Sequence, residues 1–174
     1  MRQWLGGLMT HASALSLLGT PSINGPKRIR PYTFAPTHAT WGLDNRTVLA
    51  RCVVEPGSSA NRVEYRYPGA DANPHLVVAG LLAAGADGIE KDLDPGTMGV
   101  GDLYTNPGDA TLLPADLQTA IDAFSESNLA KQLGSEFAKN YASISVAEVA
   151  LGAEHSQHTD EVNDWERERY MDHC

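Results

Sequence analysis

The sequence predicts an α+β fold in which antiparallel strands pack against helices. Residues 62–67 alternate charged and apolar side chains with the two-residue period of a β-strand. Residues 73–87 begin with Asn-Pro and continue with small apolar residues, as in a helix that packs closely against a neighbour. Apolar residues recur at helical spacing within 117–124 and 129–141, which predicts two further helices with core-facing stripes. A chain of 174 residues can bury a core and has the size of one domain or of part of one.

The amino-terminal part should contain a helix, a long loop and a strand hairpin. Residues 4–18 have the pattern of an amphipathic helix, whereas four prolines between residues 20 and 36 interrupt regular structure. Residues 39–41 and 47–54 are strand candidates separated by an Asp-Asn turn signal. Because the connection 55–60 is short and rich in turn residues, we expect 47–54 and 62–67 to form the hairpin. Cys52 lies in an apolar strand pattern and is expected in the core.

The carboxy-terminal part should be helical after a long connection. Asn73 can cap the helix 73–87, and residues 94–113 open with Asp-Pro-Gly and should lack regular structure. Residues 164–170 are rich in charge, with Trp165 and Tyr170 as apolar anchors, so we expect a terminal helix that docks on the rest of the chain. His155 and His158 could share a helix face, but their polar neighbours favour a solvated surface over a metal site.

Composition excludes several classes of protein. The formal net charge of −9 argues against a nucleic-acid partner, because neutralising phosphates requires clustered Lys and Arg. The longest apolar run, 76–86, is too short to span a bilayer, which needs about 20 residues. The two cysteines give neither a disulfide framework nor a metal-type spacing. With no secretory signal pattern at residue 1, we expect a cytoplasmic protein that binds neither nucleic acid nor membrane.

The strand 62–67 carries the most distinctive chemistry of the chain. Arg62, Glu64 and Arg66 should point to one face, with Val63 and the tyrosines on the other. Glu can ligate a hard cation such as Mg²⁺, and Arg can form forked hydrogen bonds to phosphate or carboxylate. Two interpretations remain open on spacing alone. The face is either a polyanion-binding site or a ladder of ion pairs that satisfies itself.

Several motifs in sequence order resemble the catalytic domain of the glutamine synthetase family. They are Asn-Gly-Pro-Lys-Arg at 24–28, Ala-Pro at 35–36, Trp-Gly-Leu-Asp-Asn-Arg-Thr at 41–47, Arg-x-Glu-x-Arg-x-Pro at 62–68, Ala-Asn-Pro at 72–74, Ala-Gly-Ala-Asp-Gly-Ile-Glu at 84–90, and the segment 164–170. The resemblance implies an ATP-dependent ligase that forms γ-glutamyl phosphate from glutamate and then an amide with ammonia or a primary amine. It also implies ATP and Mg²⁺ or Mn²⁺ as cofactors, and a homo-oligomer with active sites between subunits.

The resemblance also assigns roles to two arginines at the glutamate site. Arg28 would hold the α-carboxylate of glutamate, and Arg66 would lie near the reacting γ-carboxylate. A third arginine, Arg46, would contact the phosphoryl group as it is transferred, which makes Arg46 and Arg66 the expected catalytic residues. Arg46 should lie in the turn before the second strand, because its odd spacing from Arg51 would aim the two side chains oppositely on a straight strand.

The nucleotide and metal assignments follow from the same resemblance. Arg46, Arg51 and Arg62 would contact ATP. Glu64 would ligate one divalent metal ion. These groups suit the chemistry, because phosphorylation gathers negative charge that cations and fixed Arg donors must neutralise.

The chain departs from the family pattern in its extent. Residues 1–174 correspond to the later part of the catalytic domain, without the amino-terminal β-grasp domain or the front of the catalytic domain. One metal ligand remains in the chain, and one carboxylate does not make a multi-metal site. We therefore expect the chain alone to be inactive. The rival interpretation is a non-catalytic remnant that acts as a binding or structural protein.

A second departure lies at Phe34, which occupies the position where ammonia-using members carry a flap glutamate. Phe34 has no proton acceptor and offers an apolar surface instead. This favours the branch that joins glutamate to a larger amine, as the γ-glutamylpolyamine and γ-glutamylmonoamine synthetases do. Tyr104 resembles the adenylylation-loop tyrosine of some members, but the Thr-Asn-Pro that follows it differs from their pattern.

Overall fold

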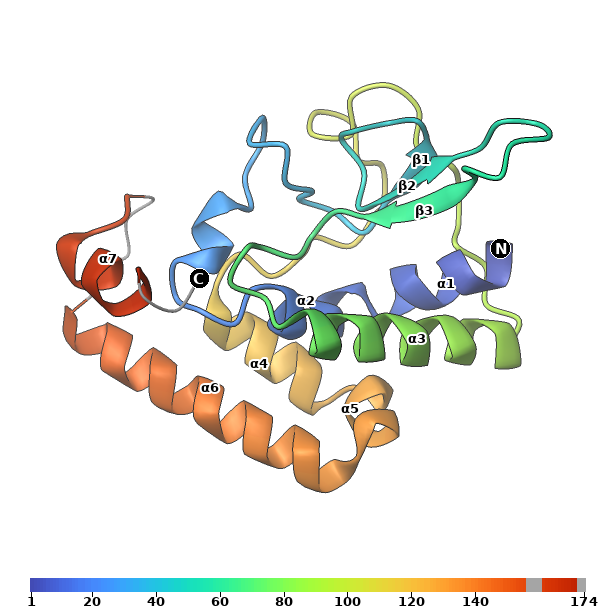
Figure 1. Cartoon of the computed structure of the whole chain (residues 1–174). Coiled ribbons are helices and arrows are strands. Elements are labelled where there is room, and N and C mark those ends of the chain that lie inside the picture. The colour runs from blue at the N-terminus through green and yellow to red at the C-terminus, as the bar shows by residue number, and fades with distance from the viewer. Residues whose placement is uncertain (156–160, 172–174) are drawn as a thin grey trace.

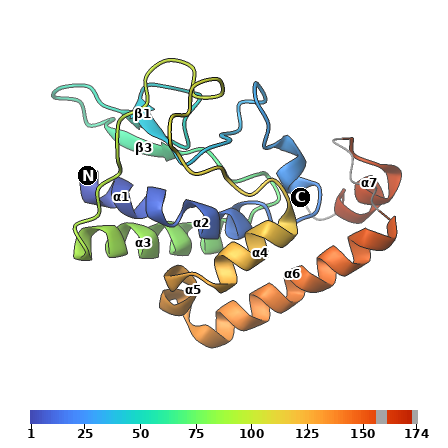
Figure 2. The same ribbon diagram turned by 180° about the vertical axis from the view of Figure 1, so that it is seen from behind.

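A small sheet lies over layers of helices in the computed structural model, which describes residues 1–155 and 161–171. The sheet and its long loops form the upper layer of Figure 1, and helices α1, α2 and α3 pass beneath the sheet. Helices α4, α5 and α6 form the layer below, and α7 lies at the end of α6. Figure 2 shows the same order from behind. The predicted α+β class is confirmed.

The sheet has the strand order β1-β2-β3, with β1 at Trp41–Leu43, β2 at Ala50–Val53 and β3 at Arg62–Tyr65. Strands β2 and β3 pair antiparallel, which confirms the predicted hairpin. Strand β1 pairs parallel to β2, although the sequence had indicated antiparallel strands throughout. The short connection from β1 to β2 is stabilised by Asn45, whose Oδ1 accepts hydrogen bonds from the backbone N–H and the hydroxyl of Thr47.

The predicted helix 4–18 is two helices, α1 at Arg2–Thr10 and α2 at Ala12–Gly19. They are separated at His11, whose ring lies 2.8 Å from the Asp87 carboxylate. This long-range contact was invisible in the sequence pattern. Helix α3 at Pro74–Glu90 begins as predicted, since Asn73 Oδ1 accepts hydrogen bonds from two backbone N–H groups of the first turn.

The predicted stripe 129–141 also belongs to two helices. They are α5 at Asn128–Leu133 and α6 at Ser135–His155, while α4 spans Leu117–Ser125. Gly134 separates α5 from α6 with a φ of 107°, a conformation that favours glycine. A one-turn 3₁₀ helix, η1, spans Gly25–Arg28 in the proline-rich loop. The predicted terminal helix is α7 at Asp164–Tyr170.

The main core lies between the helices. Buried residues of α1, α2, α3, α4, α5 and α6 form one cluster, and Val63 and Tyr65 of β3 pack against it from the sheet. Helices α1 and α3 touch at glycines, because a Cβ atom on Gly7 would lie 1.9 Å from the Ala84 carbonyl oxygen. Cys52 is buried, as predicted.

The sheet therefore has two different faces. Val63 and Tyr65 face the helices, whereas Arg62 and Glu64 face away from them, as the alternation predicted. Residues 94–113 contain no helix or strand beyond an isolated bridge between Leu112 and His38. His158 and Cys174 lie outside the described residues. Within the described part of the chain, no helix is both long and apolar enough to cross a membrane.

Candidate active site

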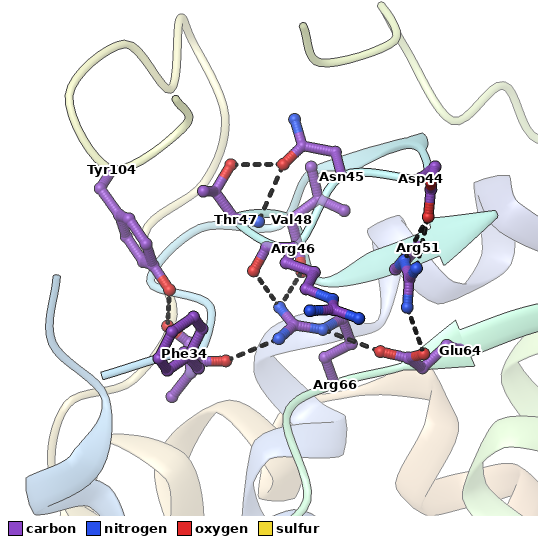
Figure 3. A network of polar contacts seen from close by, with 11 residues as sticks. Phe34, Asp44, Asn45, Arg46, Thr47, Val48, Arg51, Glu64, Arg66 and Tyr104 are labelled. Carbon is purple, nitrogen blue, oxygen red and sulfur yellow. Dashed lines mark hydrogen bonds and ion pairs between the residues drawn. The ribbon is translucent and has the colours of Figure 1, made fainter. Parts of the chain in front are cut away.

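Four charged side chains form a continuous row on the exposed face of the sheet (Figure 3). Arg51 of β2 pairs with Asp44 through Nε at 3.0 Å and with Glu64 of β3 through Nη1 at 3.0 Å. The other Glu64 oxygen accepts from Arg66 Nε at 3.0 Å. The hydrogen bond from Arg51 is the main cause that lowers the pKa of Asp44. The row alternates negative and positive charge and includes the predicted pairing of Glu64 with Arg66, while Asp44 and Arg51 complete it in place of Arg62.

Arg66 also ties its own strand to two other backbone segments (Figure 3). Its guanidinium donates to the carbonyl oxygens of Arg46, of Val48 at 3.3 Å and of Phe34 at 2.9 Å. A planar guanidinium has five N–H donors in a fixed fork, which suits several carbonyls at once. Arg66 lies just beyond β3, and its backbone N–H still donates to the Leu49 carbonyl oxygen at 2.9 Å. It therefore links the sheet to the turn at Arg46 and to the loop at Phe34.

Arg46 lies in the turn between β1 and β2, as predicted. Arg46 and Arg51 both line an open hollow of about 580 Å³, together with Leu43, Asp44, Asn45 and Gly101. Arg62 lies near this hollow, since it acts electrostatically on Asp44 along with Arg51 and Arg46. Arg62 Nη1 donates to the Ala60 carbonyl, and the side chain is exposed. The three arginines that the sequence assigned to nucleotide thus surround one carboxylate.

Arg28 lies on η1 and reaches a different part of the same region. Its Nη2 donates to the Tyr67 carbonyl oxygen, and its Nε is buried without a hydrogen-bond partner among the described residues. Burial lowers the pKa of Arg28, partly offset by Tyr67 and by the nearby Asp71. Arg66 adds a repulsive contribution, which shows that the two guanidiniums share one electrostatic environment.

The loop around Phe34 projects into solvent. Phe34 and Tyr32 are 73% and 68% exposed, and both have positive φ angles, of 63° and 64°. Two contacts hold this loop despite its exposure. Tyr104 donates from its hydroxyl to the Ala35 carbonyl at 3.0 Å, and its ring centroid lies 5.3 Å from that of Tyr32. The exposed Phe34 ring therefore belongs to the residue whose carbonyl oxygen accepts from Arg66.

Glu64 is the side chain on this face that suits a divalent metal ion. Glu64 is a carboxylate with 39% of its side chain exposed, the type of ligand that Mg²⁺ accepts. Both Glu64 oxygens accept from arginines, so a metal ion would have to compete with Arg51 and Arg66. No group of three or more His, Cys, Asp or Glu residues in the described part of the chain is placed to hold a metal ion.

The region thus combines an arginine-lined hollow, a paired carboxylate and an arginine clamp on a projecting loop. Residues 1–170 match the protein family described as "Glutamine synthetase, catalytic domain". The chain belongs to this family. Members of the family use ATP and divalent metal ions.

Relatives in the glutamine synthetase family include ligases for organic amines. The glutamate–isopropylamine ligase of a Pseudomonas species is 39% identical over 97% of the chain and 36% of that protein. The γ-glutamylethanolamide synthetase of Streptomyces coelicolor is 42% identical over 97% of the chain and 35% of that protein. The glutamine synthetase of Thermococcus kodakarensis is 34% identical over 97% of the chain and 40% of that protein. The chain therefore spans little more than a third of the length of these relatives.

Solved structures of the glutamine synthetase family agree with the fold. A complex of GmaS with ADP superposes with a TM-score of 0.77 and 32% identity, covering 99% of the chain and 39% of that structure. GmaS without ligand gives the same TM-score with 35% identity, covering 99% of the chain and 38% of that structure.

Sequence reasoning missed one member of the charged row, Asp44. Asp44 was assigned to a turn signal and to the motif at 41–47, and neither assignment gave its side chain a role. The structure gives it a φ of 46° and places its carboxylate against Arg51. The parallel pairing of β1 with β2 brings the end of β1 beside Arg51, and no local pattern in the sequence reports that pairing.

Proposed function

We propose that this chain forms part of the active site of an ATP-dependent ligase that joins glutamate to an amine. In the proposed reaction, ATP transfers its γ-phosphoryl group to the γ-carboxylate of glutamate and leaves as ADP. The amine nitrogen then attacks the acyl phosphate carbon, phosphate leaves, and the nitrogen loses a proton to solvent as the amide forms. The observation that carries the proposal is the arginine arrangement around Glu64 and Phe34. Two guanidiniums flank one carboxylate, and one of them also holds a projecting loop.

The proposal gives each side chain a role. Arg46 and Arg51 line the hollow beside the sheet and would bind ATP phosphates, with Arg62 at its margin. Arg66 would hold the reacting γ-carboxylate near the loop, and Arg28 would bind the α-carboxylate. Glu64 would supply one ligand of Mg²⁺ or Mn²⁺, which when bound would neutralise charge on the phosphates. Further metal ligands would come from residues other than 1–174, either in a longer form of the polypeptide or in a neighbouring subunit of a homo-oligomer.

The acceptor in this proposal is an organic amine. Phe34 is 73% exposed at the tip of the loop that Arg66 holds, and it offers an apolar surface in place of a proton acceptor. The matched ligases for isopropylamine and ethanolamine support this choice by analogy. Ammonia remains the alternative acceptor, because matched relatives also include glutamine synthetases.

A chimera tests the proposal directly. Residues 1–170 would replace the matching segment of the Pseudomonas glutamate–isopropylamine ligase, and product would be measured with glutamate, Mg·ATP and a panel of amines. We expect amide formation that Arg66→Met abolishes, whereas the exposed Arg167→Met leaves it unchanged. A folded chimera without activity on any amine or on ammonia would contradict the proposal and favour the non-catalytic remnant. Binding of ADP to the chain alone further distinguishes the ligase from the non-catalytic remnant, since a remnant without a nucleotide site should not bind ADP.

A further inference from the structure

We infer that helix α7 positions Arg28, and that Lys27 and Glu166 are positioning residues for the carboxylate-binding site. This inference rests on the proposed function only in naming glutamate as the ligand of Arg28. In both views of the fold, α7 lies beside the turn η1 that carries Arg28 (Figures 1 and 2). Neither the motif comparison nor the charge pattern of residues 164–170 assigns such a role to this helix.

The central contact is a buried ion pair. Lys27 Nζ lies 2.6 Å from Glu166 Oε1, and the two side chains are 14% and 0% exposed. Lys27 also donates to the Glu161 carbonyl at 2.8 Å. Glu166 is fixed on α7 because its other oxygen accepts from the Asn163 N–H in a capping box. The pair joins positions 139 residues apart, so it ties the end of the described chain to the proline-rich loop.

A second contact ties the start of the same loop to α6 and α7. The Tyr170 hydroxyl accepts from the Ile23 N–H at 3.3 Å and donates to the Glu148 carboxylate of α6. Burial and the bond to Glu148 raise the pKa of Tyr170, so the hydroxyl keeps its proton at neutral pH. Ile23 is seated on α6 at Gly152, where a Cβ atom would lie 1.8 Å from Ile23 Cδ1.

These contacts determine where Arg28 points. Lys27 and Arg28 are consecutive in a one-turn 3₁₀ helix, so their side chains project about 120° apart. When Lys27 is held against α7, Arg28 is directed to the opposite side, toward the Tyr67 carbonyl and Asp71. Among the described residues, Arg28 Nε has no hydrogen-bond partner. The guanidinium is therefore placed by its Nη2 bond to Tyr67 and by the direction of η1, which the Lys27 side chain ties to α7.

The test follows the reactivity of Arg28 in the chain itself. Phenylglyoxal modification would be timed at each arginine by peptide mass spectrometry, with fragment ions separating position 27 from position 28. In Glu166→Gln we expect Arg28 to react roughly five-fold faster, as expected when a local opening becomes easier. Arg66 should react at the wild-type rate. The same rise is expected in Lys27→Met, whereas Lys27→Arg keeps the ion pair and should retain the slow rate.

The matched control is the exposed ion pair on the same helix, Arg167 with Asp164. Asp164→Asn should leave the Arg28 rate unchanged. If Glu166→Gln does not fold, Tyr170→Phe removes only the hydroxyl contacts and should still raise the Arg28 rate. Unchanged Arg28 reactivity in the folded variants overturns the inference, as does a rise in the rate at every arginine alike. Protection of wild-type Arg28 by L-glutamate tests its substrate role separately, so the positioning role can stand even if that assignment fails.

Discussion

Arg51 of β2 and Glu64 of β3 are directly opposed across the antiparallel pair, with Arg51 Nη1 3.0 Å from Glu64 Oε2. Cross-strand neighbours on one face of a sheet are close enough for such contacts. The pair is partly exposed, so it contributes little to folding and can be rearranged by a charged ligand at small cost. Asp44 and Arg66 extend it on either side. This relationship is the basis of the first two predictions.

Arg51→Met should weaken ADP binding much more than it weakens folding stability. We expect the free energy of unfolding to fall only slightly, because ion pairs that solvent reaches contribute little to stability. We expect ADP affinity to fall about ten-fold, because a charged hydrogen bond to phosphate is lost. Urea titration measures the first quantity and calorimetric titration the second. A large loss of stability without any change in ADP binding would make the row purely structural.

Asp44→Asn should strengthen binding of ADP. The Asp44 carboxylate lies against Arg51 and near Arg46 and Arg62, so it competes with phosphate for the same positive charge. Removing one exposed charge should raise ADP affinity on the order of three-fold. The control is Asp109→Asn in the exposed loop 94–113, which should have no effect on affinity. Weaker binding in Asp44→Asn would show that the carboxylate helps the arginines instead of competing with them.

The buried Asp87 should make the protein less stable in acid. Burial opposes its ionisation, but hydrogen bonds from Lys91, His11 and Gln132 prevail and lower its pKa from 3.8 to about 2. The folded state therefore binds this proton less readily than the unfolded state. The resulting stabilisation, roughly 2 kcal/mol, is complete above pH 4 and disappears as the pH falls through 2.

Denaturant titrations between pH 5 and pH 2 measure this contribution. The wild-type chain should lose it across that window, whereas Asp87→Asn should lack it at every pH. Asp109→Asn, at an exposed position, should titrate like the wild type. Identical pH profiles for Asp87→Asn and the wild type would contradict the assignment.

Phe34→Glu should change the acceptor preference of the chimera. The substitution places a carboxylate where, by the resemblance, ammonia-using members carry a flap glutamate. We expect the ratio of ammonia to isopropylamine turnover to rise about a hundred-fold, the lower end of a typical general-base contribution. Phe34→Gln, without a titratable group, is the matched control. An equal rise in both variants would mean that side-chain size, and not proton acceptance, selects the amine.

The sequence by itself determined the local features of this protein. The alternation at 62–67 specified which residues face the helices, because a strand offers only two sides. Asn73 and Pro74 specified where α3 begins, because a cap satisfies backbone groups within one turn. The ordered motifs specified the family. Each of these signals lies within a few residues of the structure that it describes.

Only the tertiary structure decided which distant residues meet. His11, between α1 and α2, contacts Asp87 76 positions away, and the placement of Arg28 depends on α7 through Lys27 and Glu166. Asp44 joins the charged row because β1 pairs parallel to β2. Such contacts depend on the packing of buried surfaces and on the desolvation of paired charges. Those energies belong to the assembled fold and to no single segment of the chain.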